Sequence, residues 1–517
     1  MLTAILVGAN QALVVPATST RLIHANGASL RAPLMVAAEP SATVPGTRGG
    51  GDDDAFRNDP VGFCSERARQ HGGVFVTGVA GGTVFVGEAA ALSSLDSSRT
   101  SAESSAAASA GSDGSELAAP FARADGGSEA FTPYAEKFNK ACYDSIFLWI
   151  PRYKEAGFST FRFEDFIDGR VRRLVPSIRT MVLKGSAPAL FGVETYDELP
   201  AALGFENGKA LEAAYAAHAP KLRGPAKFGL PSFPSLFDLE SGGGDPKALE
   251  AGLAQWGRAQ QQSGGGGGGL LGASAAAGAS SGTSLLWELS SSVEQVTALC
   301  ATMLIVAHSN RGLHSQCCKA LVAEQAAVLK GAAPDCTITT EILRRMPELD
   351  AFANECLRLY PPSRPGKLRL SAPLSLGEGM ELPAGTQVAA EPFVASTTCD
   401  NAAAFDPSRH LASASASAAS PLVPFGTAVP GAPAASAPLC YGGAADETAS
   451  GASIAVAMAK VFYVQVSRMF EEVLIGAEPA PNPSGAPAVH MAPEKVEVLL
   501  KPKMFYELQR GVKKLRF

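Results

Sequence analysis

Two kinds of hydrophobic pattern predict the secondary structure of this chain. Between positions 72 and 87, two short β-rich runs flank a Gly-Gly pair, a pattern that predicts a β-hairpin. Positions 163–185 and 285–309 have helical length, and the second of these segments is almost continuously apolar. We therefore expect long helices and at least one hairpin.

Shorter elements follow in the second half of the chain. The pattern predicts helices at 312–329, 339–345 and 348–359, the last of them ended by Pro361 and Pro362. Short strands and turns are expected from there to position 388, with a turn at 383–385. A last long helix is predicted at 452–475.

Low-complexity stretches interrupt these elements. Segments of this composition bury too little apolar surface to offset their chain entropy, so we expect them to be loops that extend from one fold. The sequence thus predicts one domain over 51–517, with insertions near 97–127, 241–282 and 427–451. Its length also allows about three ordinary domains.

The first 50 residues form a separate segment, because positions 1–38 contain no acidic residue but do contain Arg, Ser and Thr. This composition is typical of an organelle transit peptide, and it predicts a plastid location. An unstructured terminus or a weak secretory signal are the alternatives. Without a targeting function, the protein would be cytoplasmic or peripherally bound to a membrane.

Charge and cysteine content exclude several classes of protein. The net charge is -6 and the pI is about 5.8, so the chain lacks the basic balance of a nucleic-acid-binding protein. Its nine cysteines include no CxxC pair and no zinc-module spacing, which indicates reduced thiols. No run comes near the roughly 20 apolar residues that a transmembrane helix needs, although peripheral membrane contact stays open.

The strongest motif is NECLRLYPP, in which Glu355 and Arg358 stand three positions apart on a predicted helix and share one face. Alone, such a pair is most often a solvated surface ion pair. It is followed by MELPAGTQV, then by FDPSRHL with Arg409, and then by a segment that contains Phe425-Gly426 and Cys440-Tyr-Gly442. In this order the motifs resemble the Glu-x-x-Arg, Pro-x-Arg and cysteine-loop motifs of cytochromes P450.

The resemblance implies a mainly α fold with a smaller β region, in a single large cytochrome P450 domain. It implies a buried network of Glu355, Arg358 and Arg409, and haem b with Cys440 as the thiolate ligand of the iron. The usual basic residue two positions before the ligand is here Pro438, so a nearby basic residue would have to reach the haem propionate. The other residues assigned to cofactor binding are Phe425, Gly426, Gly442, Lys367 and Arg369.

Two departures from the common pattern indicate a particular branch. The distal helix of a monooxygenase usually carries an acid and an alcohol, but the corresponding stretch at 289–294 has no threonine. The spacing from Phe425 to Cys440 is about twice the ordinary one. Both features resemble the allene oxide synthase, hydroperoxide lyase and divinyl ether synthase branch. In that branch a polar side chain on the distal helix steers the outcome, and Glu294 and Gln295 are nearest to its place, while Ser292 or Glu294 could serve in place of the missing threonine.

This branch implies a substrate that is a lipid hydroperoxide, or another apolar small molecule, rearranged or cleaved without reductase or dioxygen. Allene oxide, aldehyde and epoxyalcohol products all stay open. One alternative is an oxygen-dependent monooxygenase that needs a reductase, and a second is an inactive protein that retains the fold. For Glu294, the alternative to a catalytic role is a helix residue that faces solvent or a neighbouring loop.

Overall fold

The fold is seen in a computed structural model of the chain. The structure describes residues 44–46, 52–58, 60–79, 82–87, 91, 127–150, 174–218, 245–263, 268–276, 281–308, 315–333, 335–360, 367–370, 373–377, 380–390, 404–411, 452–475 and 498–503. The N-terminal segment predicted at 1–50 lies almost entirely outside them, as do the predicted insertions at 97–127 and 427–451. Residues from Ala38 to Phe517 form one compact unit.

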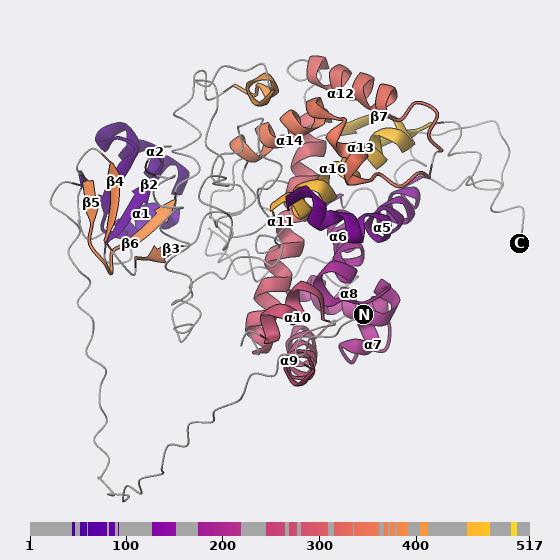
Figure 1. Ribbon diagram of the computed structural model, residues 1–517, viewed down its shortest axis with the longest axis horizontal. Coiled ribbons are helices and arrows are strands. Elements are labelled where there is room, and N and C mark those ends of the chain that lie inside the picture. Colours follow the sequence, from indigo (N-terminus) through magenta and orange to yellow (C-terminus); the bar gives the residue numbers. More distant parts are fainter. Residues whose placement is uncertain are drawn as a thin grey trace, which may run out of the picture. The chain divides into compact units, whose positions relative to one another are not determined.

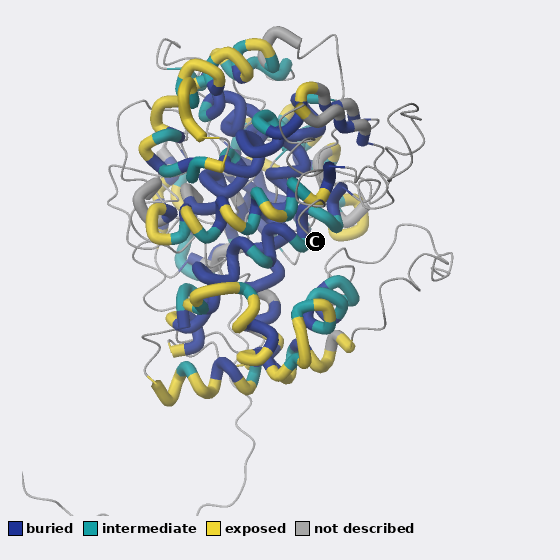
Figure 2. The backbone as a smooth tube through the Cα atoms, turned by 90° about the vertical axis from the view of Figure 1, so that its right-hand side faces the viewer, coloured by how far each residue is buried: buried dark blue, intermediate teal, exposed yellow. Residues whose placement is uncertain are grey.

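The centre of the helical part is α11 (Gly282–His308), an almost wholly buried helix. It packs against α6 (Leu174–Phe191), α9 (Pro246–Gln262) and α16 (Ala452–Met469), and Figures 1 and 2 show it running through the middle of the helices. A helix that is apolar on most of its circumference is stable only when other elements surround it. This explains why the longest apolar segment of the sequence lies at the centre.

The remaining helices surround this centre. Ala135–Phe147 (α5) packs on α6 and α16, while α14 (Pro347–Leu359) contacts α11 and α12 (Ser315–Val328). The other described helices and 3-10 turns are α1 (Asp52–Asn58), α2 (Pro60–His71), η2 (Gly127–Tyr134), η4 (Tyr196–Glu198), α7 (Leu199–Ala202), α8 (Gly208–His218), α10 (Gly269–Ala276), α13 (Thr340–Arg344) and η6 (Pro407–His410).

The β structure joins distant parts of the sequence. Its main sheet has the strand order β1 (Val74–Thr77), β2 (Thr83–Val86), β6 (Gln387–Ala390) and β3 (Lys367–Arg369). The predicted hairpin is β1–β2, which pairs antiparallel, whereas β2 pairs parallel with β6. The first strands of the chain therefore share a sheet with strands that follow the Glu-x-x-Arg motif, as a single fold requires.

Two short antiparallel sheets complete the β structure. One pairs β4 (Leu374–Gly377) with β5 (Met380–Leu382), and the predicted turn after β5 contains Gly385 at φ 83°, where glycine avoids the strain of a left-handed backbone. The other pairs β7 (Phe470–Ile475) with β8 (Val498–Pro502). The mainly α fold with a smaller β region is thus confirmed.

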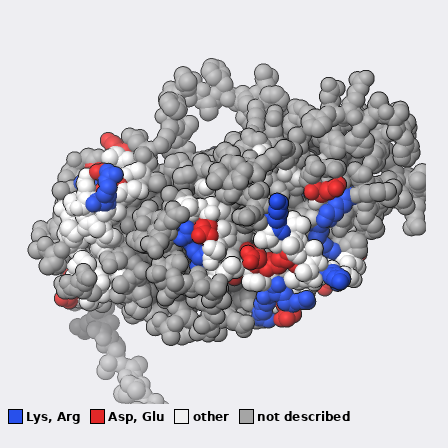
Figure 3. All heavy atoms as spheres, turned by 90° about the horizontal axis from the view of Figure 1, so that it is seen from above, with Lys and Arg blue, Asp and Glu red and all other residues white. Residues whose placement is uncertain are grey.

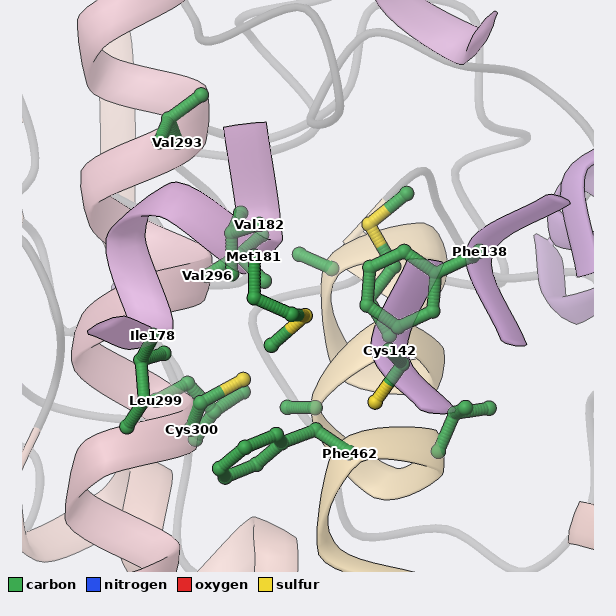
Figure 4. Close-up of a cluster of buried hydrophobic side chains, with 14 of the residues drawn as sticks. Phe138, Cys142, Ile178, Met181, Val182, Val293, Val296, Leu299, Cys300 and Phe462 are labelled. Atoms are coloured by element: carbon green, nitrogen blue, oxygen red, sulfur yellow. The ribbon is translucent and has the colours of Figure 1, made fainter. Parts of the chain in front are cut away.

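Side chains from four helices meet in the main hydrophobic core. Figure 4 shows α11 directing one side toward α6, with α5 and α16 facing the same cluster. Dense packing of apolar side chains excludes water and supplies most of the stability of such a core. The residues labelled there are Val293, Val296, Leu299 and Cys300 of α11, Ile178, Met181 and Val182 of α6, Phe138 and Cys142 of α5, and Phe462 of α16.

The low-complexity stretch at 241–282 is not simply a loop, and our prediction for it was wrong. It contains α9 and α10. The Asp245 side chain caps α9 by accepting a hydrogen bond from the Lys247 amide, and Pro246 occupies the first turn. Leu249 and Leu253 then bury one face of the helix. Sparse apolar residues at helical spacing were sufficient to form a helix next to the Gly-rich run.

The predicted last helix is also shorter than expected. It ends at Met469, and the chain continues as the strand β7. The sequence FEEVLI is rich in aromatic and β-branched residues, and antiparallel pairing with β8 satisfies its backbone groups. The tertiary partner, which is distant in sequence, decides the conformation of this segment.

One described segment, Glu288–His308 in α11, is long and apolar enough to cross a membrane by composition, but all of it is buried inside the fold. This segment is therefore the buried core helix of the fold. On the face drawn in Figure 3, the basic and acidic side chains of the described residues are interspersed. That face shows no extended basic region of the kind that binds phosphate backbones.

Candidate functional site

Helix α14 carries the Glu-x-x-Arg motif, and its start is fixed from α12. The Glu324 carboxylate accepts hydrogen bonds from the backbone amides of Glu348 (2.7 Å) and Leu349 (3.0 Å). These amides belong to the first turn, where no helical carbonyl can satisfy them, and a carboxylate there also complements the helix dipole. Glu324 therefore fixes the position of the start of α14, the helix that carries Glu355 and Arg358.

Glu355 lies at the centre of a buried hydrogen-bond network, which we call the Glu355 cluster. Arg358 donates to both carboxylate oxygens of Glu355, from Nη2 to Oε1 at 2.7 Å and from Nε to Oε2 at 2.8 Å. Arg409 Nε donates to Oε1 at 3.2 Å. The Glu355 and Arg358 side chains are fully buried, so the interpretation of this pair as a solvated surface ion pair is wrong.

The same cluster binds the backbone of the segment that contains Arg409. The Asp406 amide donates to Glu355 Oε1 at 2.8 Å, and Arg358 Nη2 donates to the Ala404 carbonyl at 2.9 Å. Arg409 Nη2 also donates to this carbonyl at 3.3 Å. The structure thus brings together the three charged residues that the sequence assigned to a network, and α14 anchors both the side chains and the backbone of η6.

His410 is a further member of the Glu355 cluster, and the prediction from sequence missed it. Its Nε2 lies 2.9 Å from Glu355 Oε2, and its side chain is almost completely buried. The sequence feature that could have indicated His410 as a member of the cluster is its position directly after Arg409 in FDPSRHL. In a 3-10 turn consecutive side chains diverge, so the adjacency alone did not predict a shared partner.

The electrostatics of the cluster keep Glu355 ionised. Burial alone would raise the pKa of its carboxyl group, but the hydrogen bonds from Arg358 and His410 and the charge of Arg358 lower it to about 2. A buried carboxylate with several donors is a rigid anchor, because removing one partner leaves an uncompensated polar atom away from water.

Several described cysteines are unsuited to bind iron as thiolates. Burial raises the pKa of the Cys142 and Cys300 thiols well above their usual range, and it raises the pKa of Cys318 to about 11. A metal-binding sulfur must be a thiolate, and these environments favour the neutral thiol. Cys440, the predicted ligand, lies outside the described residues together with Phe425, Gly426 and Gly442.

The distal helix predicted from sequence is α11, and Glu294 on it is not exposed to solvent. It is 2% exposed and makes a two-point ion pair with Arg179 of α6, at 2.6 Å to Oε1 and 3.0 Å to Oε2. Tyr215 of α8 donates its hydroxyl to the same Oε1 at 3.2 Å, and burial raises the pKa of this tyrosine well above its usual range. The alternative of a solvent-facing residue is wrong, and the carboxylate is held by α6 and α8.

Ser292 and Gln295 lie on other sides of α11. Ser292 donates its hydroxyl to the Glu288 carbonyl of its own helix at 2.9 Å. Gln295 is 6% exposed, and no hydrogen bond joins its amide to another described residue. At 3.6 residues per turn, Gln295 points about 100° away from Glu294, so the structure separates these two candidates rather than bringing them together.

A threonine beyond the stretch 289–294, which the sequence did not single out, lies further along α11. Thr302 is fully buried, and its hydroxyl has no hydrogen-bond partner among the described residues. It follows Gln295 by seven positions, which places both on nearly the same side of the helix. By contrast, the Thr297 hydroxyl donates to the Val293 carbonyl at 2.7 Å.

Lys367 and Arg369, the candidates for a propionate partner, lie in β3, opposite Ala389 and Gln387 of β6. Their side chains are outside the described part of the chain.

Comparison with known proteins agrees with this architecture. A family model described as Cytochrome P450 matches residues 312–427, the part that contains α14, β3–β6 and the Glu355 cluster. No curated protein sequence matches the chain.

Solved structures resemble the chain over most of its length. The structure of retinoic acid bound cyanobacterial CYP120A1 has a TM-score of 0.53 and 18% identity, and the match covers 87% of this chain and 96% of that chain. A mutant haem domain of cytochrome P450DA has a TM-score of 0.51 and 15% identity, with 87% and 95% covered. The chain therefore has the cytochrome P450 fold.

The two comparisons agree on the cytochrome P450 fold, and the family model matches the part of it that carries the Glu-x-x-Arg motif. They imply haem b ligated by a cysteine thiolate. The described residues fit this group. The Glu355 cluster holds η6 against α14, in a segment that precedes the cysteine at 440 in the sequence, and burial disfavours the thiolate form of Cys142, Cys300 and Cys318.

Proposed function

We propose that the chain is a haem-thiolate enzyme that rearranges or cleaves fatty acid hydroperoxides without a reductase or dioxygen. The activity would be of the allene oxide synthase, hydroperoxide lyase or epoxyalcohol synthase type, and Cys440 would be the iron ligand. When bound, haem b with a thiolate ligand supplies homolytic cleavage of an O–O bond that the substrate already contains. The residues of this chain would bind and orient the substrate.

The observation that carries the proposal is the ion pair between Glu294 and Arg179. An oxygen-activating enzyme needs a titratable group on its distal helix to deliver protons. Glu294 is buried, and the donors of Arg179 and Tyr215 occupy both of its carboxylate oxygens, so neither oxygen is directed toward a substrate. A hydroperoxide isomerase needs no such relay, so this arrangement supports chemistry that consumes no external protons.

Gln295 supports the same proposal. Gln295 is 6% exposed, and its amide is uncharged. A side-chain amide can both donate and accept a hydrogen bond, so it can bind a polar group of the substrate without a change of charge. We assign it the role of orienting the oxygen-bearing part of the substrate by a neutral hydrogen bond.

A reductase-free assay tests the proposal. Purified ferric protein is mixed with a linoleic or linolenic acid hydroperoxide in the absence of NADPH and of any redox partner. We expect loss of the conjugated-diene absorbance and products identifiable by mass spectrometry. An unchanged diene absorbance with haem-loaded protein would end the proposal.

Replacing Gln295 tests its orienting role. Gln295→Leu should change the ratio of products or lower turnover, while Gln325→Leu on α12 should not. Gln325 is a matched control because it is the same residue type, is buried to a similar extent and lies on a different helix. If both substitutions change turnover equally, the cause is a change in packing, and the Gln295 amide does not orient the substrate.

The second candidate is an oxygen-dependent monooxygenase, and Thr302 is the observation that favours it. Its buried hydroxyl without a partner among the described residues would provide an alcohol on the side of α11 that also carries Gln295. This candidate predicts turnover only when NADPH, reductase and dioxygen are all present, and it predicts that Thr302→Val suppresses product formation.

A protein that shows no Soret band after supplementation with a haem precursor would instead be an inactive relative.

A further inference from the structure

We propose that His410 is a positioning residue of the haem site, whose Nε2–H holds the second carboxylate oxygen of Glu355. The two oxygens of this carboxylate accept different numbers of hydrogen bonds. Among the described residues, Oε1 accepts from Arg358, Arg409 and the Asp406 amide, whereas Oε2 accepts only from Arg358 and His410. Without His410, Oε2 would keep a single donor from this part of the chain, in a fully buried environment.

The direction of the hydrogen bond follows from the state of Glu355. Because the hydrogen bonds around it outweigh burial and keep its pKa at about 2, the carboxylate is ionised and can only accept. The proton between the two groups therefore belongs to His410 Nε2, and this holds for a neutral ring and for a charged ring alike. Hydrogen bonds to an ionised group are shorter and stronger than those between neutral groups.

The hydrogen bond of His410 matters because this residue lies at the end of η6. It is the last residue of η6, and the described segment ends one residue later at Leu411. Arg409 and His410 are consecutive, and both donate to the same carboxylate. Two adjacent side chains bonded to one rigid group hold η6 against α14, in the segment that precedes Cys440 in the sequence. This inference rests on the haem-thiolate assignment and does not depend on which substrate is used.

The test compares His410→Leu, His410→Gln and Ser408→Ala in the full-length holoprotein. Leucine fills similar space without a donor, while glutamine places an amide N–H at about the distance of Nε2. Ser408→Ala is the control in the same turn, because the Ser408 hydroxyl bonds to Asp406 at the exposed edge and to no other described residue. The readouts are the rate of haem transfer to excess apomyoglobin and the ferrous-CO spectrum.

We expect His410→Leu to release haem about tenfold faster, as loss of one buried charge-assisted hydrogen bond implies, and to lose part of the thiolate-type CO band. His410→Gln should restore both to near the values of the wild type and of Ser408→Ala. If leucine and glutamine behave alike, ring shape and not the donor matters, and the proposal fails.

If His410→Leu does not fold, the glutamine variant decides alone. Retention of haem and of the CO band at the wild-type level supports the donor role, and their loss overturns it. A wild-type protein that takes up no haem would also overturn it. Failure of the hydroperoxide assay would leave the result unaffected, because haem retention and the CO spectrum require no substrate.

Discussion

At the scale of single residues, Glu355 is the most consequential position in the described structure. It is the only negative charge that the structure places between Arg358 and Arg409, and all three side chains are buried among the described residues. Removing Glu355 from this set takes away the negative charge that both buried guanidinium groups share. That loss is more costly than the loss of any single exposed ion pair.

We predict that Glu355→Gln lowers the free energy of unfolding by about 3–5 kcal/mol, measured by urea denaturation, and reduces haem content. The matched control is Asp350→Asn on the same helix. Asp350 pairs with Lys460 but is half exposed, and its loss should cost less than about 1 kcal/mol. Similar losses for the two variants would mean that the Glu355 cluster contributes no more than a surface pair.

The pKa of Glu355 also predicts a pH dependence. In the folded protein it is lowered to about 2 from a usual value of 4.5, so the ionised form stabilises the fold at pH values above 4.5. This contribution should be lost as the pH falls from about 4.5 to 2, when the unfolded chain takes up the proton first. Thermal melts of the wild type and of Glu355→Gln across this range should therefore converge in acid. A constant difference between their melting temperatures would contradict the assignment.

At the scale of elements, Glu294 connects α11 to α6 and α8. The sequence placed this residue correctly on a long apolar helix but could not show its partners, because Arg179 and Tyr215 come from helices far away in sequence. The same limit applies to β7, whose strand conformation depends on β8, and to His410, whose partner lies on α14. By contrast, the local sequence pattern predicted α11, α12, α14 and the β1–β2 hairpin. In these segments the spacing of hydrophobic residues and the positions of Gly and Pro indicate the same element.

We predict that Glu294→Gln destabilises the protein by about 3 kcal/mol, because it breaks the buried two-point ion pair with Arg179. Tyr215→Phe should cost about 1 kcal/mol, the usual contribution of one neutral hydrogen bond. The pair Arg179→Met with Glu294→Leu should be less destabilised than Glu294→Gln alone, since no buried charge remains. Urea denaturation of these variants beside the wild type measures the differences.

The same pair of substitutions separates structure from catalysis. If the ion pair only holds the helices together, hydroperoxide turnover by the folded fraction should survive the double replacement within a few fold. Abolished turnover in a folded, haem-loaded double variant would show that Glu294 takes part in the reaction.

At the scale of the whole molecule, the shared sheet and the buried α11 are the features that a single large fold requires. Strand β2 near the start of the chain pairs with β6, which follows the Glu-x-x-Arg helix. The motifs that carry the resemblance are short, but the fold that surrounds them matches solved cytochromes P450 over 87% of the chain. The cysteine segment itself could be read only from the sequence, since position 440 lies outside the described residues.

The ferrous-CO spectrum of the purified protein and of Cys440→Ser tests the central claim of a haem-thiolate centre most directly. Cys318→Ser is the control, because burial raises the pKa of that thiol to about 11 and so keeps it from acting as a thiolate. We predict that the wild type and the control show the band at the wavelength that names the superfamily, and that Cys440→Ser loses it. A band that survives in Cys440→Ser, or a wild-type protein without any Soret absorbance, would contradict the account.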